Sequence, residues 1–327
     1  MRSNASMTTF TDLLPADFDA VSLRDDVRAG LTAQPKSLPP RWFYDKIGSS
    51  LFDEITRLPE YYPTRTERGI LVARAAEIVE AAGATVLVEL GSGSSEKTTR
   101  LLDALAARTS EPRYVALDVS EDALTGAADQ LRRRYPALAI DLIRADFSVH
   151  LGQLPAPGHR LVAFLGSTIG NFEPAARALF LRSLREVLEP GEHFLLGTDL
   201  VKPSTVLIPA YDDAAGVTAA FNLNVLRVIN NRLGADFELD AFRHLAVWDA
   251  DREWIEMRLR ATQAMEVSVA GLGLTVEFAD GEEILTEISA KFRRDGVVAE
   301  LTEAGFTPAG WWIDPRDWFA LSLWRAI

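Results

Sequence analysis

The chain has 327 residues, 48% hydrophobic and 25% charged, as expected of a soluble globular protein with one large or two ordinary domains. Its net charge of -13 argues against binding to nucleic acid or to anionic membranes, because both require basic patches. It has no cysteine, which excludes disulfides, thiolate nucleophiles and cysteine-based zinc sites, and its four histidines show no metal-binding spacing. We therefore expect no metal.

The first residues carry no recognisable targeting signal. Residues 1–12 are polar and lack the apolar core of a secretory signal, so we expect them to form a disordered leader. No apolar run approaches the ~18 residues that a membrane-spanning helix requires. These features predict a cytoplasmic protein that does not associate with membranes.

The chain begins with helical patterns and then alternates strands with helices. Residues 16–34 read as a helix that ends at a proline-rich stretch, residues 41–64 are rich in aromatics and prolines, and residues 65–82 show helical periodicity up to Gly83. Short apolar runs predict strands at 85–90, 113–118, 139–143, 160–166 and 192–198. Helices are predicted from about 95 to 108, at 121–134 and at 174–187. This rhythm predicts an α/β fold with a parallel sheet covered by helices on both faces.

The rhythm changes after Asp199. Residues 203–234 look helical, residues 243–278 alternate like antiparallel strands, and residues 293–305 return to helix. Two strand-like runs follow, near 307–312 and 318–324. We expect a second α+β domain inserted into the first.

A glycine turn follows the first predicted strand of the sheet. Gly91 and Gly93 lie between the apolar run and the next helix, which is the layout of nucleotide-binding loops. Glu96 stands where phosphate-binding motifs need a glycine, and its carboxylate would repel a polyphosphate. The expected ligand is a nucleoside without phosphates that carries positive charge, and S-adenosylmethionine fits this description. A plain structural turn is the alternative.

Acidic residues end the next two strands. Asp118 lies where a ribose would be gripped by one carboxylate, or it caps the following helix. Asp146 could accept a hydrogen bond from an adenine amino group, and Phe147 could stack on the adenine ring or pack in the core. After the fourth strand, Asn171 offers both a donor and an acceptor and suits a zwitterion, although it could be a turn residue.

Long strings of the sequence carry a family resemblance from about Leu23 onward. They begin at Pro35 (PKSLPP), Trp42 (WFYD), Thr56 (TRLPEYYPTR), Val88 (VELGSG), Phe164 (FLGSTIGN), Leu196 (LGTDLVK), Ala210 (AYDDAAGVTA) and Gly281 (GEEILTEIS). In these strings the chain resembles the S-adenosylmethionine-dependent L-histidine N-alpha-methyltransferases of ergothioneine biosynthesis. The resemblance implies a class I methyltransferase fold, which is Rossmann-like and ends in an antiparallel hairpin. It also implies transfer of three methyl groups to the α-amine of L-histidine, giving hercynine.

The resemblance assigns domains and site residues. The cofactor domain would be 65–201 and 291–327, and the substrate domain 13–64 and 202–290. The implied S-adenosylmethionine site consists of Tyr44, Gly91, Lys97, Asp118, Asp146 and Phe147. The implied histidine site consists of Tyr61, Asn171, Tyr211, Met257, Glu287 and Ser289.

Within the implied histidine site the roles differ. Tyr61, Asn171 and Tyr211 would hold the amino-acid backbone. Glu287 and Ser289 would hydrogen-bond the imidazole, and Met257 would line its pocket. Tyr44, Tyr61 and Asn171 would orient the reacting amine. We expect a monomer with the small molecule L-histidine as its partner and with no nucleic acid or membrane.

Three other functions are compatible with parts of the sequence. The enzyme could methylate another amino acid such as tryptophan or tyrosine, although Glu287 and Met257 speak against this. A nicotinamide-dependent oxidoreductase would suit the glycine loop and Asp118, but Glu96 opposes a pyrophosphate. A cofactor-binding regulator without catalysis is the third alternative.

Overall fold

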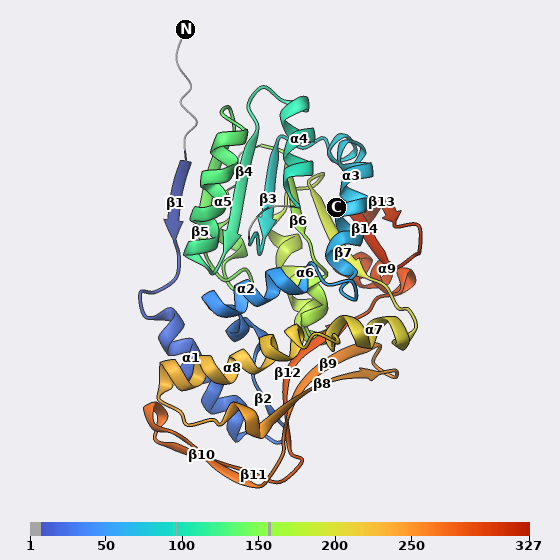
Figure 1. Cartoon of the computed structure of the whole chain (residues 1–327). Helices are drawn as coiled ribbons and strands as arrows, with labels where there is room; N and C mark the ends of the chain where they lie inside the picture. Colours follow the sequence, from blue (N-terminus) through green and yellow to red (C-terminus); the bar gives the residue numbers. More distant parts are fainter. Residues whose placement is uncertain (1–7, 94, 96, 156–157) are drawn as a thin grey trace. The chain divides into compact units, whose positions relative to one another are not determined.

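The structure, a computed structural model, describes residues 8–93, 95, 97–155 and 158–327. These residues divide into two compact units, each built from separate stretches of the chain. Unit 1 comprises residues up to Leu14, Arg65–Leu200 and Phe292–Ile327, and unit 2 comprises Pro15–Thr64 and Val201–Lys291. Figure 1 shows the elements of both units.

Unit 1 contains a mixed sheet whose strands run in the order β1-β5-β4-β3-β6-β7-β14-β13. The strands are β1 (Thr8–Asp12), β3 (Val86–Leu90), β4 (Arg113–Asp118), β5 (Ala139–Arg144), β6 (Arg160–Phe164), β7 (His193–Asp199), β13 (Phe306–Ile313) and β14 (Phe319–Ala326). Neighbours from β1 to β7 pair in parallel, whereas β14 pairs antiparallel with both β7 and β13. A doubly wound parallel sheet that ends in an antiparallel hairpin confirms the predicted class I methyltransferase fold.

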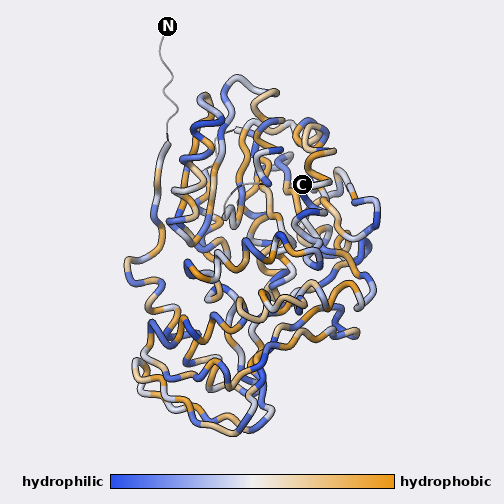
Figure 2. Tube along the Cα trace, viewed as in Figure 1, coloured by the Kyte–Doolittle hydropathy of each residue, from blue (hydrophilic) through white to orange (hydrophobic). Residues whose placement is uncertain are grey.

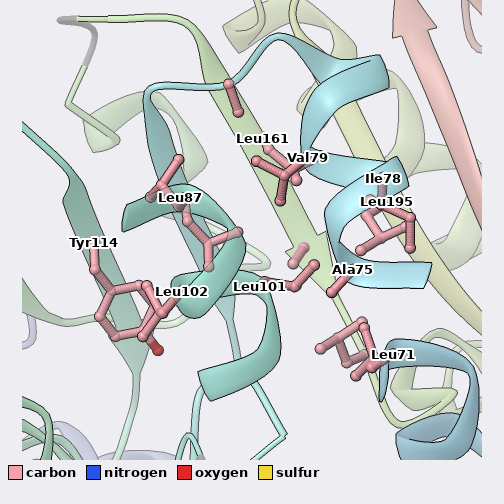
Figure 3. Close-up of a cluster of buried hydrophobic side chains, with 14 of the residues drawn as sticks. Leu71, Ala75, Ile78, Val79, Leu87, Leu101, Leu102, Tyr114, Leu161 and Leu195 are labelled. Carbon is pink, nitrogen blue, oxygen red and sulfur yellow. The ribbon is translucent and has the colours of Figure 1, made fainter. Parts of the chain in front are cut away.

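Helices cover both faces of this sheet. They are α3 (Pro63–Ala82), α4 (Thr99–Arg108), α5 (Glu121–Arg134), α6 (Pro174–Val187) and α9 (Arg294–Glu303), with short 3-10 turns η2 (Leu151–Gln153) and η3 (Thr168–Asn171). Figure 3 shows apolar side chains of α3 and α4, such as Val79 and Leu101, in one buried cluster with side chains of the sheet, where Val79 lies beside Leu161 of β6. Phe164 of β6 points to the opposite face, where its ring lies 5.1 Å from that of Phe180 of α6. Apolar stretches follow the central strands along the trace in Figure 2.

Unit 2 is an α+β unit. Its helices are α1 (Phe18–Thr32), α2 (Lys46–Ile55), α7 (Ser204–Tyr211) and α8 (Val217–Leu233), with 3-10 turns η1 (Pro40–Phe43), η4 (Leu239–Ala241) and η5 (Ala270–Leu272). One sheet runs β2-β12-β9-β8 and a separate hairpin pairs β10 with β11. These strands are β2 (Lys36–Ser37), β8 (Phe242–Asp249), β9 (Trp254–Ala261), β10 (Met265–Val269), β11 (Leu274–Phe278) and β12 (Glu283–Ala290).

The structure corrects two expectations about unit 1. Residues 8–12, expected within a disordered leader, form β1, which pairs in parallel with β5 and exposes most of its side chains. The helix after the glycine turn begins at Thr99 rather than near Ser95, because Ser95 has a left-handed φ of 52° that a helix cannot accept. The expected role of Glu96 falls outside the described residues.

Unit 2 differs from expectation in three places. The helical stretch 203–234 is broken between α7 and α8, where Gly216 adopts a left-handed φ of 75°. The aromatic segment contains α2, whose first turn is capped because the Asp45 carboxylate accepts the backbone N–H of Gly48 at 2.8 Å. Strand β12 was not predicted at all, although it pairs with both β9 and β2.

None of the helices in the described part of the chain combines the length and apolar character that a membrane crossing demands. Across the same residues, no three histidine, aspartate or glutamate side chains gather closely enough to hold a metal ion.

Candidate functional site

The glycine loop of unit 1 is tied to the end of β4. The backbone N–H of Gly91 donates to the carbonyl of Leu117 at 2.8 Å, and Gly91 has a left-handed φ of 67°. The N–H of Gly93 donates to the Asp118 carboxylate at 2.9 Å. The loop and the acidic strand end, predicted separately, therefore meet at the carboxyl edge of the parallel sheet, where ligands of such folds bind.

Asp118 anchors this loop and does not cap the next helix. One carboxylate oxygen accepts the Gly93 N–H and the other accepts the N–H of Ser120 at 2.9 Å, whereas the Ser120 hydroxyl caps α5 through Ala123. Burial raises the pKa of the Asp118 carboxyl above its usual range, while these backbone hydrogen bonds act in the opposite direction. Each carboxylate oxygen has a second lone pair that a ligand hydroxyl could use.

Phe147 borders the same loop. A side-chain carbon built at Gly91 would lie 3.7 Å from the Phe147 ring, so the two residues are neighbours. The half-buried Phe147 ring also packs edge-on against Phe164 with centroids 5.2 Å apart. Asp146 accepts hydrogen bonds from the backbone and hydroxyl of Ser148 at 2.8 and 2.5 Å. Phe147 thus has the core contacts of the alternative interpretation and still lies beside the candidate ligand loop.

Lys97 and Asn171 complete the predicted residues of unit 1. Asn171 is half-buried at the end of η3, in the loop that follows β6. The ammonium of Lys97 pairs with the carboxylate of Glu67, a fully buried residue of α3. Glu67 also accepts the backbone N–H of Gly166 at 2.7 Å, which joins α3, the glycine loop and the loop after β6.

Glu67 is absent from the sequence-based prediction. A signal for it exists, because Glu67 lies three and four residues before the buried Ile70 and Leu71. That spacing puts a carboxylate on the apolar face of a helix, which is costly unless a partner is present.

A second buried carboxylate, that of Glu89, is hydrogen-bonded to residues in and after the glycine loop. Glu89 of β3 accepts hydrogen bonds from the hydroxyls of Thr98 and Tyr114, and Tyr114 is also bonded to the Ser95 hydroxyl at 2.9 Å. Burial raises the pKa of Glu89 to about 7, against the opposing effect of its hydrogen-bond partners. The carboxyl that interrupts the apolar run of β3 therefore fixes both ends of the loop.

In unit 2, aromatic rings link the predicted tyrosines. Tyr44 lies edge-on to Phe52 at 5.6 Å between centroids, Phe52 lies 6.2 Å from Tyr61, and Tyr61 lies 6.4 Å from Tyr211. Tyr44 is 47% exposed, so a large part of its ring is accessible to a ligand. The four rings form a continuous aromatic row, which we call the tyrosine row.

A polar cluster lies at the buried end of this row. The hydroxyls of Tyr211 and Ser289 are 2.8 Å apart, and the ammonium of Lys291 donates to both. The backbone of Tyr211 is fixed because the Nε2 of His244 donates to its carbonyl at 2.7 Å. The amide of Asn222 lies 2.8 Å from the other ring nitrogen, and donation from this amide makes Nε2 the protonated one. Lys291 was not predicted as a site residue, although it lies two positions after Ser289, the spacing at which strand side chains share a face.

Glu287 and Met257 lie on the same sheet face as Ser289. Met257 of β9 pairs in register with Glu287 of β12, so their side chains share one face, and Ser289 follows two residues later on that face. Glu287 is half-buried, whereas Met257 is 2% exposed. The structure therefore brings together Tyr61, Tyr211, Met257, Glu287 and Ser289 within unit 2.

Comparison with known proteins gives a consistent result. A family model described as "Histidine-specific methyltransferase, SAM-dependent" matches residues 23–326. The chain is 59% identical to the histidine N-alpha-methyltransferase of Mycolicibacterium smegmatis, over 96% of this chain and 98% of that protein. The protein of the same name from Mycobacterium tuberculosis is 54% identical over 95% and 97%, respectively. Ergothioneine biosynthesis protein 1 of Neurospora crassa is 29% identical, over 79% of this chain and 34% of that protein.

Proposed function

The chain belongs to the SAM-dependent, histidine-specific methyltransferase family, and from that premise we propose that it transfers three methyl groups from S-adenosylmethionine to the α-amine of L-histidine. The product would be hercynine, for ergothioneine biosynthesis, as the names of its relatives suggest. Family membership decides against the nicotinamide-dependent oxidoreductase and the regulator without catalysis.

The residues of unit 1 fit S-adenosylmethionine. Asp118 would accept hydrogen bonds from the ribose hydroxyls with its remaining lone pairs, and Phe147, which is a neighbour of Gly91, would stack on the adenine. Asp146 would accept from the adenine amino group. Lys97 would attract the cofactor carboxylate, and Tyr44 of unit 2 would contact the methionine end. When bound, the cofactor supplies an electrophilic methyl group on a sulfonium.

The residues of unit 2 suit a free amino acid with an imidazole side chain. Glu287 would accept the ring N–H and Ser289 would bond the other ring nitrogen, while Met257 forms an apolar wall beside them. Tyr211 and Tyr61, together with Asn171 of unit 1, would hold the amino-acid backbone. The observation that carries this choice is the carboxylate of Glu287 next to the hydroxyl of Ser289 on one strand face.

The protein mainly has to align the reacting groups. The amine attacks through its lone pair, so it must be neutral, and Tyr44, Tyr61 and Asn171 would orient it for in-line displacement. Three successive transfers require a site that tolerates a growing quaternary ammonium. The tyrosine row offers π faces that attract such a cation.

Mass spectrometry tests this proposal directly. The protein is incubated with S-adenosylmethionine and each of the twenty amino acids in turn. Histidine alone should gain the mass of three methylene groups. Methylation of tryptophan or tyrosine in place of histidine would refute the substrate assignment, and accumulation of the monomethylated product would refute the threefold transfer.

A further inference from the structure

Strand β12 has an irregularity directly before Glu287. Leu285 of β12 pairs with Arg258 of β9, and Glu287 pairs with Met257, the neighbour of Arg258. Between these two pairs β12 advances by two residues and β9 by only one, so Thr286 is the extra residue of a β-bulge. A bulge changes the direction of nearby side chains, and bulges are frequent beside active sites.

This bulge decides which face of the sheet carries Glu287. Side chains alternate between the two faces of a regular strand. In a regular ladder, Thr286 would therefore lie opposite Met257. Glu287 would then lie opposite Glu256, whose carboxylate is paired with Arg258 on that face. The extra residue moves Glu287 to the other face, where it lies with Met257.

The face that receives Glu287 is the buried one. On β9 it carries Ile255, Met257 and Leu259, none of which is more than 2% exposed. Ser289 follows Glu287 by two residues and therefore reaches the same face. The pair of polar groups that the proposed function assigns to the imidazole thus depends on the one-residue slip at Thr286.

Hydrogen bonds of the Thr286 side chain hold the bulge. Thr286 is buried, and its hydroxyl shares its hydrogen between the carbonyl of Met257 at 2.9 Å and Oδ1 of Asn222 at 2.7 Å. Asn222 belongs to α8 and is fully buried, and its amide also donates to the carbonyl of Arg258 at 3.1 Å. One hydroxyl therefore ties β12 to both β9 and α8 at the residue where the pairing slips.

We propose that Thr286 is a positioning residue, which turns Glu287 toward the substrate imidazole by holding the bulge. This inference rests on the proposed function, in which Glu287 accepts the ring N–H of histidine. Valine has the shape of threonine without the hydroxyl. It would suit the buried position opposite Met257 in a regular ladder, so that Glu287 would lose its fixed direction.

A double-mutant cycle tests whether Thr286 acts through Glu287. The value of kcat/KM for histidine is measured for the parent, Thr286→Val, Glu287→Ala and the protein that carries both changes. Thr286→Val should lower kcat/KM about tenfold in the parent, which is equivalent to about 1.4 kcal/mol. In the Glu287→Ala background it should lower kcat/KM less than about twofold, because the side chain that it positions is already absent.

Two further variants control for shape and for the loss of a hydroxyl in general. Thr286→Ser keeps the hydroxyl and should keep kcat/KM within about threefold of the parent value. Thr262 lies in the same unit, and its hydroxyl donates to the carbonyl of Ala241 at 3.1 Å. Thr262→Val should leave histidine kinetics unchanged. Calorimetric titration should give the parent affinity for S-adenosylmethionine in every variant, which also shows that each one folds.

The outcomes distinguish this inference from the proposed function. If Glu287→Ala leaves histidine kinetics unchanged, the assigned role of Glu287 fails, whatever Thr286 does. If that variant is impaired and Thr286→Val has the same effect in both backgrounds, or none in the parent, only the role of Thr286 is refuted. A loss in Thr286→Ser as large as in Thr286→Val would also overturn it. Should Thr286→Val not fold, Thr286→Ala takes its place in the same cycle with the same expectation.

Discussion

The ammonium of Lys97 lies against the carboxylate of Glu67, a side chain with no exposed surface. A buried carboxylate with a cationic partner keeps that cation in one position, because separating them would leave a charge uncompensated. Lys97 is therefore already paired before any ligand carboxylate arrives. In the proposed function it would hold the cofactor from a position set by helix α3.

Gly197 of β7 provides a test of this relationship. A side-chain carbon at Gly197 would come within 2.3 Å of a Glu67 carboxylate oxygen and 3.3 Å of the Phe319 ring. We expect Gly197→Ala to destabilise the protein by about 1–3 kcal/mol through overpacking and to weaken S-adenosylmethionine binding by displacing Glu67. Thermal denaturation and calorimetric titration measure the two effects.

The control for this variant is Gly69→Ala. Gly69 lies on the exposed side of α3 and a methyl group there would meet nothing within 4 Å. Alanine is the better helix former, so this variant should gain up to about 1 kcal/mol and bind the cofactor normally. A Gly197→Ala protein with unchanged stability and affinity would show that Glu67 has room to move and does not fix Lys97.

Asp118→Ala tests the ribose assignment. The substitution removes the proposed ribose contact and also the carboxylate that holds Gly93 at 2.9 Å. S-adenosylmethionine affinity, measured by titration calorimetry, should fall about tenfold or more, because hydrogen bonds to a charged group are each worth about 1.5–3 kcal/mol. Asp122→Ala, an exposed acidic residue in the first turn of α5, serves as the control. A dissociation constant equal to that of the parent would rule out the assignment.

Glu287→Ala tests substrate choice. We expect kcat/KM for histidine to fall at least about tenfold, because the imidazole N–H loses a charged acceptor, while cofactor affinity stays the same. Glu283 lies on the same strand but its carboxylate is paired with Arg258 and Arg260, so Glu283→Ala should leave the preference for histidine intact. Unchanged histidine kinetics in the Glu287 variant would remove the specificity argument.

Glu89 should make stability depend on pH. Its pKa is raised from 4.5 to about 7 in the folded state, so the folded protein binds this proton more tightly than the unfolded chain. The contribution is complete below pH 4.5 and is lost as the pH rises through 7. As the pH rises from 4.5 to 7, the loss of this contribution should lower the free energy of unfolding by about 3 kcal/mol.

The Glu89→Gln variant isolates this effect. Glutamine keeps the shape of the side chain and removes its titration. Denaturant unfolding between pH 5 and 7.5 should give a flatter profile for the variant than for the parent. Parallel profiles for the two proteins would contradict the raised pKa.

Much of unit 1 could be predicted because its strands are buried on both faces. Parallel strands such as β4 and β6 read as uninterrupted apolar runs, and the glycine turn marks where the first of them ends. Strand β1 escaped prediction because it is an edge strand of mostly polar, exposed residues held by backbone pairing with β5. A strand that is held at the edge of a sheet by backbone hydrogen bonds does not need the apolar side-chain pattern by which a strand is predicted from sequence.

Candidate site residues could be predicted from the sequence where they stand at the ends of strands. They could not be predicted where only tertiary packing brings them to the site. Asp118 ends one apolar strand and Asp146 follows another, so the sequence alone predicts that both lie at the carboxyl edge of the sheet. Glu67 reads as one more charged residue of an amphipathic helix until folding buries it. Lys291 reads as an ordinary surface lysine, because its partner Tyr211 lies far away in the sequence.

The chain passes between the two units after Leu14, Thr64, Leu200 and Lys291, so neither unit is encoded by one uninterrupted stretch. In unit 2, Lys36 and Ser37 pair with Ile284 and Leu285, which lie far away in the sequence. In unit 1, β3 can pair with β6 only after β4 and β5 have been synthesised. During translation, the early part of unit 2 must therefore remain unpaired until the ribosome has passed residue 285. Folding of the nascent chain should be slow and dependent on protection from aggregation, because its decisive contacts are non-local.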